Sequence, residues 1–126
     1  MEHRDYENGD RVFREGDAAV AAYLVVEGRV EIWCMQDENA IVISQIGKGE
    51  LFGEMALLES RVRTTSARCL EPTTLTIVPK EEFDRRMNST DPVVQRIIQQ
   101  LIRRLRKQNK ALIESLTVGR KPASLS

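Results

Sequence analysis

A glycine, a carboxylate and an arginine lie close together near the middle of the sequence, and their types suit an anionic ligand. Gly53 precedes five good helix formers, residues 54–58. A helix that begins after a glycine presents free N–H groups and the positive end of its dipole, which favours a bound anion. Arg63 follows Glu54 by nine residues, and a guanidinium can pair with two phosphate oxygens at once.

Glu54 needs a different role, because a carboxylate and a phosphate are both negative. A carboxylate can accept a hydrogen bond from a sugar hydroxyl. Together the three residues therefore predict a site for a ribose phosphate. Two plainer interpretations remain open from the residues alone. Arg63 and Glu54 could pair with each other on a surface, and Thr64 and Thr65 could be ordinary strand residues.

Short strands must position these groups. Runs rich in β-branched and aromatic residues alternate with turns over the first eighty residues. The predicted strands span residues 11–13, 22–26, 30–34, 40–46, 66–70 and 74–78. Many short strands at close spacing favour a sandwich or barrel, so we expect a mainly β fold, an antiparallel β-roll.

Helices follow the strands. Residues 79–88 predict a short helix. Asp91 is a good N-cap and Pro92 fits a first helical turn. No Gly or Pro interrupts residues 93–116, where apolar residues recur every three or four positions, as in a long amphipathic helix. We expect a single domain whose β-roll core spans 1–90, with the phosphate-binding segment at 52–67, a helix at 91–117 and a flexible tail at 118–126.

One seam of the long helix has heptad spacing. It consists of Ile98, Ile102, Leu105, Asn109, Leu112 and Leu116. A buried Asn at an a position favours a parallel two-stranded coiled coil, so the seam predicts a homodimer through residues 93–116. Val94, Ile97 and Leu101 lie to one side, where we expect them to pack on the roll or cover the ligand. The rival prediction is a monomer whose helix closes as a lid.

Composition narrows the class of protein. The 126 residues are 41% hydrophobic and 30% charged, which is ordinary for a soluble domain. No apolar run is long enough to span a bilayer, and the first residues do not form a signal peptide, so we expect a cytoplasmic location. Cys34 and Cys69 are predicted to be small buried hydrophobes. His3 is the single histidine, which excludes a histidine-rich metal site and a cupin-type enzyme.

Charge is distributed unevenly along the chain. Residues 1–60 carry 5 basic and 13 acidic side chains, a net charge of −8, and residues 61–126 carry +8, so the whole chain has a net charge of zero. We interpret most of the C-terminal arginines as a solvated helix face, and Arg63 as the exception. Residues 103–107 are expected to be a charged helix face and to make no direct contact with nucleic acid.

The segment that carries the chemistry resembles a known family. Residues 52–58 (FGEMALL) followed by 63–67 (RTTSA) are similar to the phosphate-binding cassette of cyclic-nucleotide-binding domains. That family includes regulatory subunits of cyclic-nucleotide-dependent kinases, catabolite-activator-type regulators and cyclic-nucleotide-gated channels. The resemblance extends to residues 13–17 (FREGD), 23–30 and 46–54, and covers roughly residues 8–116.

The resemblance implies a role for each cassette residue. Backbone amides of Gly53, Met55 and Ala56 would approach the phosphate and ribose. Glu54 would accept a hydrogen bond from the ribose 2′-hydroxyl. Arg63 would pair with the equatorial phosphate oxygen of a bound cAMP or cGMP, with no metal.

The implied contacts to the base are less direct. Thr64 would support the phosphate or base through its amide and hydroxyl, and Thr65 completes the ligand-binding residues, although alanine is frequent at its position. Val62 stands where many members have proline. Leu51 and Ile43 are candidates to flank the purine.

The sequence as a whole predicts a cyclic nucleotide sensor without catalysis of its own, which passes ligand binding to its C-terminal helix. Two alternatives stay open. One is the nucleotide-binding half of a catabolite-activator-type transcription regulator lacking its DNA-binding domain. The other is an interaction scaffold that keeps the β-roll and has lost the ligand, against which the presence of both Glu54 and Arg63 argues.

Overall fold

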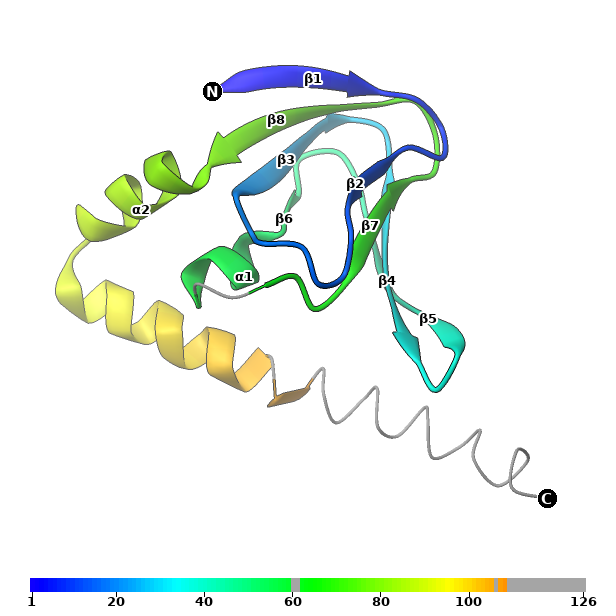
Figure 1. Ribbon diagram of the computed structural model, residues 1–126. Coiled ribbons are helices and arrows are strands. Elements are labelled where there is room, and N and C mark those ends of the chain that lie inside the picture. The colour runs from blue at the N-terminus through cyan, green and yellow to red at the C-terminus, as the bar shows by residue number, and fades with distance from the viewer. Residues whose placement is uncertain (60–61, 106, 109–126) are drawn as a thin grey trace.

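Two antiparallel sheets of four strands each enclose the core (Figure 1). The computed structural model describes residues 1–59, 62–105 and 107–108. The strand orders are β1-β8-β3-β6 and β2-β7-β4-β5. The strands are β1 (Glu2–Tyr6), β2 (Arg11–Phe13), β3 (Ala21–Glu27), β4 (Val30–Gln36), β5 (Asn39–Ile46), β6 (Leu51–Phe52), β7 (Ser66–Cys69) and β8 (Thr73–Pro79). The predicted β-roll is confirmed.

Alternation along the strands builds the core. In β4, Val30, Ile32 and Cys34 are buried, and the residues between them are more exposed, because successive side chains of a strand point to opposite faces. The inward residues of both sheets form one apolar cluster that also contains Cys69. Cys34 and Cys69 are buried and not disulfide-bonded, as predicted.

The N-terminal strand β1 was not predicted by the sequence pattern. It lies at the edge of its sheet and pairs only with β8, with Glu2 opposite Ile77 and Tyr6 opposite Thr73. Its first four residues are all exposed. An edge strand that buries little carries no alternation of polar and apolar residues, so pattern analysis cannot detect it.

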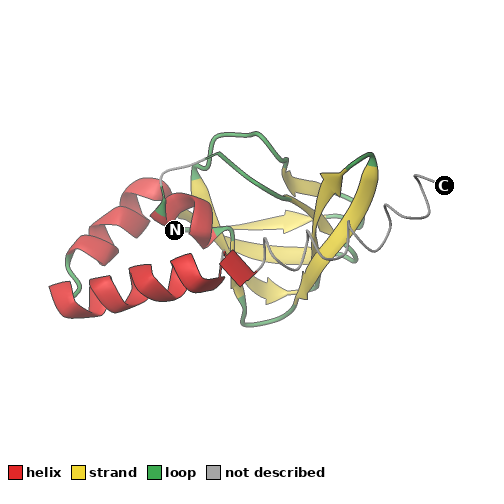
Figure 2. Cartoon of the chain, turned by 90° about the horizontal axis from the view of Figure 1, so that it is seen from below, coloured by secondary structure: helices red, strands yellow, loops and turns green. Residues whose placement is uncertain are grey.

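The helices gather at one end of the strands (Figure 2). Helix α1 (Glu54–Leu58) follows β6 directly, and α2 (Lys80–Asn88) follows β8. A second apolar cluster joins them, in which Ala56 and Leu57 of α1 pack with Phe83 of α2. Residues 92–105 are also helical and are called here the C-terminal helical segment.

Asp91 caps the C-terminal helical segment as predicted. Its carboxylate accepts a hydrogen bond from the N–H of Val93 at 2.8 Å and a longer one from Val94. Gln95 ties the segment to the end of α2, because its side-chain amide donates to the carbonyl oxygens of Met87 and Thr90. Residue 106 and residues 109–126 lie outside the described residues. They include half of the predicted coiled-coil seam, Asn109, Leu112 and Leu116, and the predicted tail.

The two apolar faces of this segment differ in part from the prediction. Ile102 is 9% exposed and Ile98 is half-buried, although both were assigned to the dimer seam. The residues expected to pack on the roll or cover the ligand do not pack on the roll and are exposed, and so is Leu105 of the predicted seam. Together with Leu105 they form an exposed apolar row, called here the outer stripe. The outer stripe consists of Val94, Ile97, Leu101 and Leu105. Heptad spacing identified an apolar helix, but it could not tell which side faces the roll.

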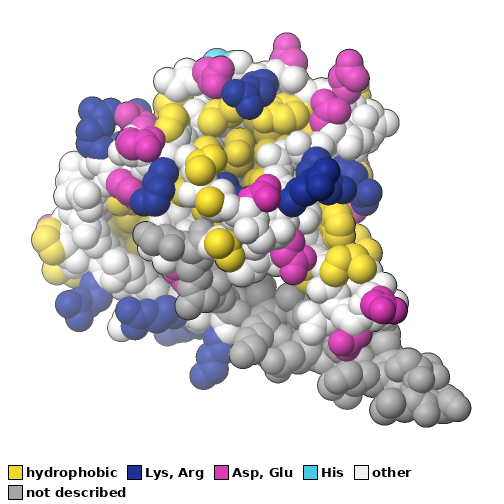
Figure 3. Space-filling view, viewed as in Figure 1, with side chains coloured by type: hydrophobic (Ala, Val, Ile, Leu, Met, Phe, Trp, Pro, Cys, Tyr) yellow, Lys and Arg dark blue, Asp and Glu magenta, His cyan; other side chains and the backbone are white. Residues whose placement is uncertain are grey.

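The described basic residues of the C-terminal helical segment lie on a solvated face, as predicted. Arg96, Arg103 and Arg104 are exposed on the C-terminal helical segment, and Figure 3 shows Lys and Arg side chains along this edge of the molecule, at lower left. Arg63 is the contrast, since only 3% of its surface is accessible.

Candidate functional site

Gly53 forms the corner between β6 and α1. It is the N-cap of α1 and has a left-handed backbone conformation, φ 79° and ψ 2°, which glycine adopts without steric cost. A Cβ atom here would lie 3.0 Å from Nη1 of Arg63 and 3.3 Å from the ring of Phe13. Glycine is therefore required both for the turn and for the close approach of the guanidinium.

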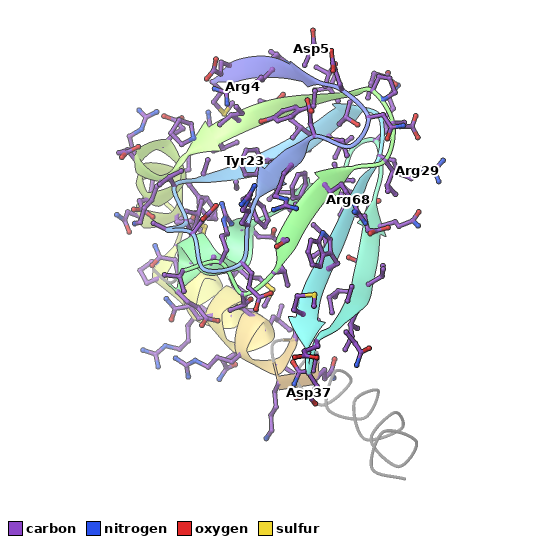
Figure 4. The ribbon with its side chains drawn as sticks, turned by 45° about the vertical axis from the view of Figure 1, so that its right-hand side comes forward. Arg4, Asp5, Tyr23, Arg29, Asp37 and Arg68 are labelled. Atoms are coloured by element: carbon purple, nitrogen blue, oxygen red, sulfur yellow. The ribbon has the colours of Figure 1, made fainter. Side chains whose placement is uncertain are left out.

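Arg63 reaches back to this corner and is buried inside the roll. Its Nη1 donates a hydrogen bond to the carbonyl oxygen of Gly53 at 2.6 Å, and its Nη2 donates to the carbonyl oxygen of Ala21. The guanidinium carbon lies 4.1 Å from the centroid of the Phe13 ring and 5.9 Å from that of Tyr23. Figure 4 labels Tyr23 in the interior of the roll. Nε of Arg63 is buried and has no hydrogen-bond partner within the described part of the chain.

A turn at residues 16–18 holds the backbone of Arg63. The N–H of Arg63 donates to the carbonyl oxygen of Asp17 at 2.7 Å, and the N–H of Gly16 donates to the carbonyl oxygen of Arg63 at 2.8 Å. Ala18 and Val62 form an isolated antiparallel bridge beside these bonds. The FREGD segment therefore fixes the loop that carries Arg63, a role that sequence reasoning missed although it had singled out the motif.

Glu54 is the first residue of α1 and is half-buried. Burial raises the pKa of its carboxyl group, while its own backbone N–H and the charge of Arg63 act in the opposite direction. Burial likewise lowers the pKa of Arg63, and Tyr23, Asp17 and Glu54 oppose that shift. No ion pair joins Arg63 to Glu54, both of which the structure describes. Because Arg63 is buried, their predicted alternative role as a surface pair is wrong.

The remaining residues of the predicted site lie around this corner. Met55 is half-buried on α1, whereas Ala56 is buried. The first N–H groups of a helix have no carbonyl partner within it, so the amides at the start of α1 suit an anion. Thr64 is exposed and Thr65 is half-buried, directly before β7.

Leu51 and Ile43, the two residues predicted to flank the purine, lie on opposite faces of their sheets. It is 44% exposed and pairs with Leu24 across β6 and β3, and directly opposite residues of an antiparallel pair share a face. Leu24 is itself exposed, so both side chains lie on the outer face of the sheet. Leu51 therefore does not line the interior of the roll, and its predicted contact with the purine stays a prediction. Ile43 packs against the core cluster, on the inner side.

The corner thus combines one buried guanidinium, the start of a helix and one half-buried carboxylate. A buried cation attracts an anion more strongly than an exposed one, because the surrounding dielectric constant is low. Within residues 1–59, 62–105 and 107–108 the structure contains no cluster of three or more metal-ligating side chains. In the same residues no helix is both long and apolar enough to cross a bilayer.

Comparison with known proteins identifies the family. Residues 3–90 match the cyclic nucleotide-binding domain family, and this match covers the β-roll, α1 and α2. The chain belongs to this family. The resemblance stated from the cassette residues is confirmed.

Individual relatives differ in what else they contain. The chain is 32% identical over 115 residues to the cyclic AMP receptor protein of Thermus thermophilus, covering 89% of this chain and 52% of that protein. It is 44% identical over 63 residues to the cAMP-dependent protein kinase type II regulatory subunit of Drosophila melanogaster, covering 50% and 17%. The chain thus spans about half, or much less, of the length of these relatives.

Solved structures give the same result. The EAL enzyme Bd1971 in its cAMP-bound form matches with a TM-score of 0.80 and 34% identity, over 98% of this chain and 33% of that one. The cGMP-bound form of the same enzyme matches with a TM-score of 0.80 and 33% identity. The similarity therefore lies in a binding domain that larger proteins with different activities share.

Proposed function

We propose that this chain binds cAMP or cGMP, with the phosphate against Arg63 and the start of α1, and that binding alters the C-terminal helical segment. The observation that carries this proposal is the burial of Arg63 beside Gly53. Arg63 is 3% exposed inside an apolar roll, and its guanidinium donates to two neutral carbonyl oxygens and forms no ion pair with the described residues. A buried charge of this kind needs a compensating group. A cyclic phosphate monoanion supplies the missing charge.

Glu54 is proposed to read the ribose. The half-buried carboxylate lies at the start of α1, one residue from the corner that holds Arg63. A ligand held by its phosphate at Arg63 would bring its ribose against the same end of α1. The 2′-hydroxyl then donates to Glu54, which keeps the two negative groups apart. Backbone amides of Gly53, Met55 and Ala56 complete the contacts to the phosphate and ribose.

Base choice is proposed to be permissive, with cAMP the preferred ligand. Solved structures of the EAL enzyme exist with cAMP and with cGMP, and this chain resembles both forms. Thr64 follows Arg63 and is exposed, so its hydroxyl is accessible to a guanine amino group. Replacing Thr64 with Ala should weaken cGMP binding more than cAMP binding, and an equal effect on both ligands would contradict a contact to guanine.

Calorimetric titration tests the proposed function. We expect saturable binding of cAMP and of cGMP with one site per chain, and much weaker binding of adenosine, which lacks the phosphate. An Arg63→Ala variant should lose most of the difference between cAMP and adenosine. If neither cyclic nucleotide binds the parent protein at millimolar concentration, the domain is a scaffold and the proposal is wrong.

Contacts among the helices provide a route from the ligand to the C-terminal helical segment. Ala56 and Leu57 of α1 pack with Phe83 of α2. The end of α2 is in turn bonded to Gln95, through the carbonyl oxygen of Met87 at 2.7 Å. A shift of α1 on ligand binding would therefore move α2 and the segment beyond it. A ligand changes such an arrangement only by binding one state more tightly.

Amide hydrogen exchange tests this coupling. cAMP should change the exchange rates of residues 92–105 in the parent protein. A Phe83→Ala variant should still bind cAMP but show a smaller change in that segment, because the contact between α1 and α2 is reduced. Identical exchange with and without cAMP in the parent protein would contradict the coupling.

The outer stripe is proposed to pair two copies of the chain. Val94, Ile97 and Leu101 are between 43% and 51% exposed at helical spacing, which suits a helix-to-helix contact. Sedimentation with and without cAMP should show a dimer that Leu101→Glu disrupts. Gln99→Glu adds the same charge at another exposed position of the segment and should leave the dimer intact. A monomer at high concentration in both conditions would contradict pairing.

Three further parts of the proposal rest on the sequence. We propose that the chain catalyses no reaction itself, acts in the cytoplasm and makes no direct contact with nucleic acid. Each is open to direct assay with the full-length protein.

A further inference from the structure

The guanidinium carbon of Arg63 lies over the ring of Phe13. The distance from the guanidinium carbon to the ring centroid is 4.1 Å, well within the range of a cation–π contact. Phe13 is 7% exposed and Arg63 is 3% exposed, so water screens the contact little. We propose that Phe13 is a positioning residue, which holds the Arg63 side chain in its phosphate-binding orientation before the ligand arrives. This inference rests on the proposed function.

Three directions of restraint converge on the guanidinium. The carbonyl oxygens of Gly53 and Ala21 each accept a hydrogen bond from one terminal nitrogen, which fixes the guanidinium within its plane. The Phe13 ring contacts the same guanidinium, with its centroid 4.1 Å from the guanidinium carbon. These two bonds use two of the five N–H donors of the guanidinium, so donors remain on its terminal nitrogens for a phosphate. A side chain ordered in advance loses less conformational entropy when the ligand binds.

Of the three contacts that restrain the guanidinium, only the contact with Phe13 can be removed by replacing a side chain. The two carbonyl oxygens belong to the backbone and survive any side-chain change. A leucine at residue 13 keeps an apolar side chain in the core but lacks the negative π-face that attracts a cation. We therefore expect Phe13→Leu to weaken cAMP binding about ten-fold. Phe13→Tyr, which keeps the ring, should bind nearly as tightly as the parent.

Phe52 offers a matched control. Its ring centroid lies 6.1 Å from that of Phe13 and 5.3 Å from that of Tyr23, and it is 3% exposed. No cation contact of Phe52 occurs in the described residues. Phe52→Leu therefore damages the same aromatic cluster without touching the guanidinium.

A double-mutant comparison separates positioning from general damage. Each leucine variant is made alone and together with Arg63→Met, and cAMP affinity is measured by NMR titration, which reaches millimolar dissociation constants. If Phe13 acts through Arg63, Phe13→Leu has little further effect in the Arg63→Met background, whereas any effect of Phe52→Leu persists. If the Phe13→Leu effect is the same in both backgrounds, the positioning role is wrong.

A measurement without ligand keeps this inference distinct from the proposed function. The Phe13 ring should shift the NMR signals of the Arg63 side chain upfield through its ring current, and the buried Nε–H should exchange slowly. Phe13→Leu should remove that shift, and Phe52→Leu should leave most of it. If Phe13→Leu does not fold, Phe13→Met serves in both experiments. An unchanged Arg63 signal would overturn the inference even if cAMP binds, and a parent protein that shows the shift but binds no nucleotide would overturn only the proposed function.

Discussion

Two arginines five residues apart experience opposite environments. Arg63 precedes β7 and turns into the roll, where it is 3% exposed and bonds to backbone carbonyl oxygens. Arg68 lies within β7 and points outward, with its side chain 44% exposed. It pairs with Glu31 at 2.6 Å and lies 5.8 Å from the ring of Trp33. Figure 4 labels Arg68 on the sheet that contains β7.

The two arginines differ in the charge of the groups that they bond to, and this difference separates the proposed ligand site from the outer surface. Arg68 has a carboxylate partner and needs no ligand to complete its contacts. The guanidinium of Arg63 has only neutral hydrogen-bond partners within the described residues. It lies in a low-dielectric interior, where a charge without an ion pair is costly. The arginine without an ion pair in the described residues is therefore at the proposed ligand site, and the arginine with one is on the outer surface.

The largest expected effect is the loss of ligand affinity in Arg63→Ala. Truncating one partner of a desolvated charge pair costs roughly 2–5 kcal/mol, which corresponds to about thirty-fold to several thousand-fold in cAMP affinity. Arg68→Ala is the matched control and should bind cAMP as the parent does. Calorimetry on both variants measures the difference, and equal affinities would contradict the distinction between the two arginines.

Gly53 and Gly28 provide a second comparison between the proposed ligand site and a position away from it. Gly53→Ala should lower cAMP affinity by about ten-fold or more, because its Cβ would displace both Arg63 and the turn, and a strained residue costs roughly 1–3 kcal/mol. Gly28 also has a positive φ, 105°, but it lies in the β3–β4 hairpin, where a Cβ would be 2.3 Å from Oγ1 of Thr73. Gly28→Ala should lower the free energy of unfolding instead.

Thermal unfolding and cAMP titration of both glycine variants test this division. The folded fraction of Gly28→Ala should bind cAMP with nearly normal affinity. If Gly28→Ala loses affinity as strongly as Gly53→Ala does, the effect of Gly53 is not specific to the site.

Glu54→Gln should remove the preference for the ribose hydroxyl. In the parent protein, 2′-deoxy-cAMP should bind more weakly than cAMP by about ten-fold, since a hydrogen bond to a charged group contributes roughly 1.5–3 kcal/mol. In Glu54→Gln the loss should be much smaller. Competition titrations compare the two ligands on each protein, and equal losses would contradict the role of Glu54.

The raised pKa of Glu54 also predicts opposite effects of pH on binding and folding. Burial raises the pKa of this carboxyl in the folded protein, so its charged form destabilises the fold at neutral pH. That penalty is lost as pH falls through the folded-state pKa. Over the same range cAMP affinity should fall, because a protonated Glu54 is a poorer acceptor. Glu54→Gln should flatten both profiles and raise stability at neutral pH. A parent profile identical to that of the variant would contradict this prediction.

The smallest expected effect is on the stability of Arg68→Ala. Its ion pair with Glu31 is partly exposed, and such pairs contribute about 0–1 kcal/mol. Urea unfolding should therefore show a decrease within that range. A decrease of several kcal/mol in the free energy of unfolding would contradict the prediction that this ion pair contributes little to stability.

Local patterns predicted the elements and the chemistry of the cassette. Alternation in β4, the N-cap at Asp91 and the glycine before α1 each act within a few residues of sequence, so their physical effects can be read without the fold. The pairing of residue types at Gly53, Glu54 and Arg63 also follows from local spacing. Their predicted ligand roles await the experiments above.

Tertiary structure decided which side each residue faces and what lies against it. Leu51 and Ile43 looked equivalent as apolar candidates, but the pairing of Leu51 with Leu24 places it outside, whereas Ile43 packs inward. In the C-terminal helical segment, Val94, Ile97 and Leu101 were expected to pack on the roll or cover the ligand, and they are exposed. The contacts of Arg63 with Ala21 and Phe13 join residues 42 and 50 positions away in the chain. Such contacts depend on how the sheets close around the core, and no local pattern encodes that.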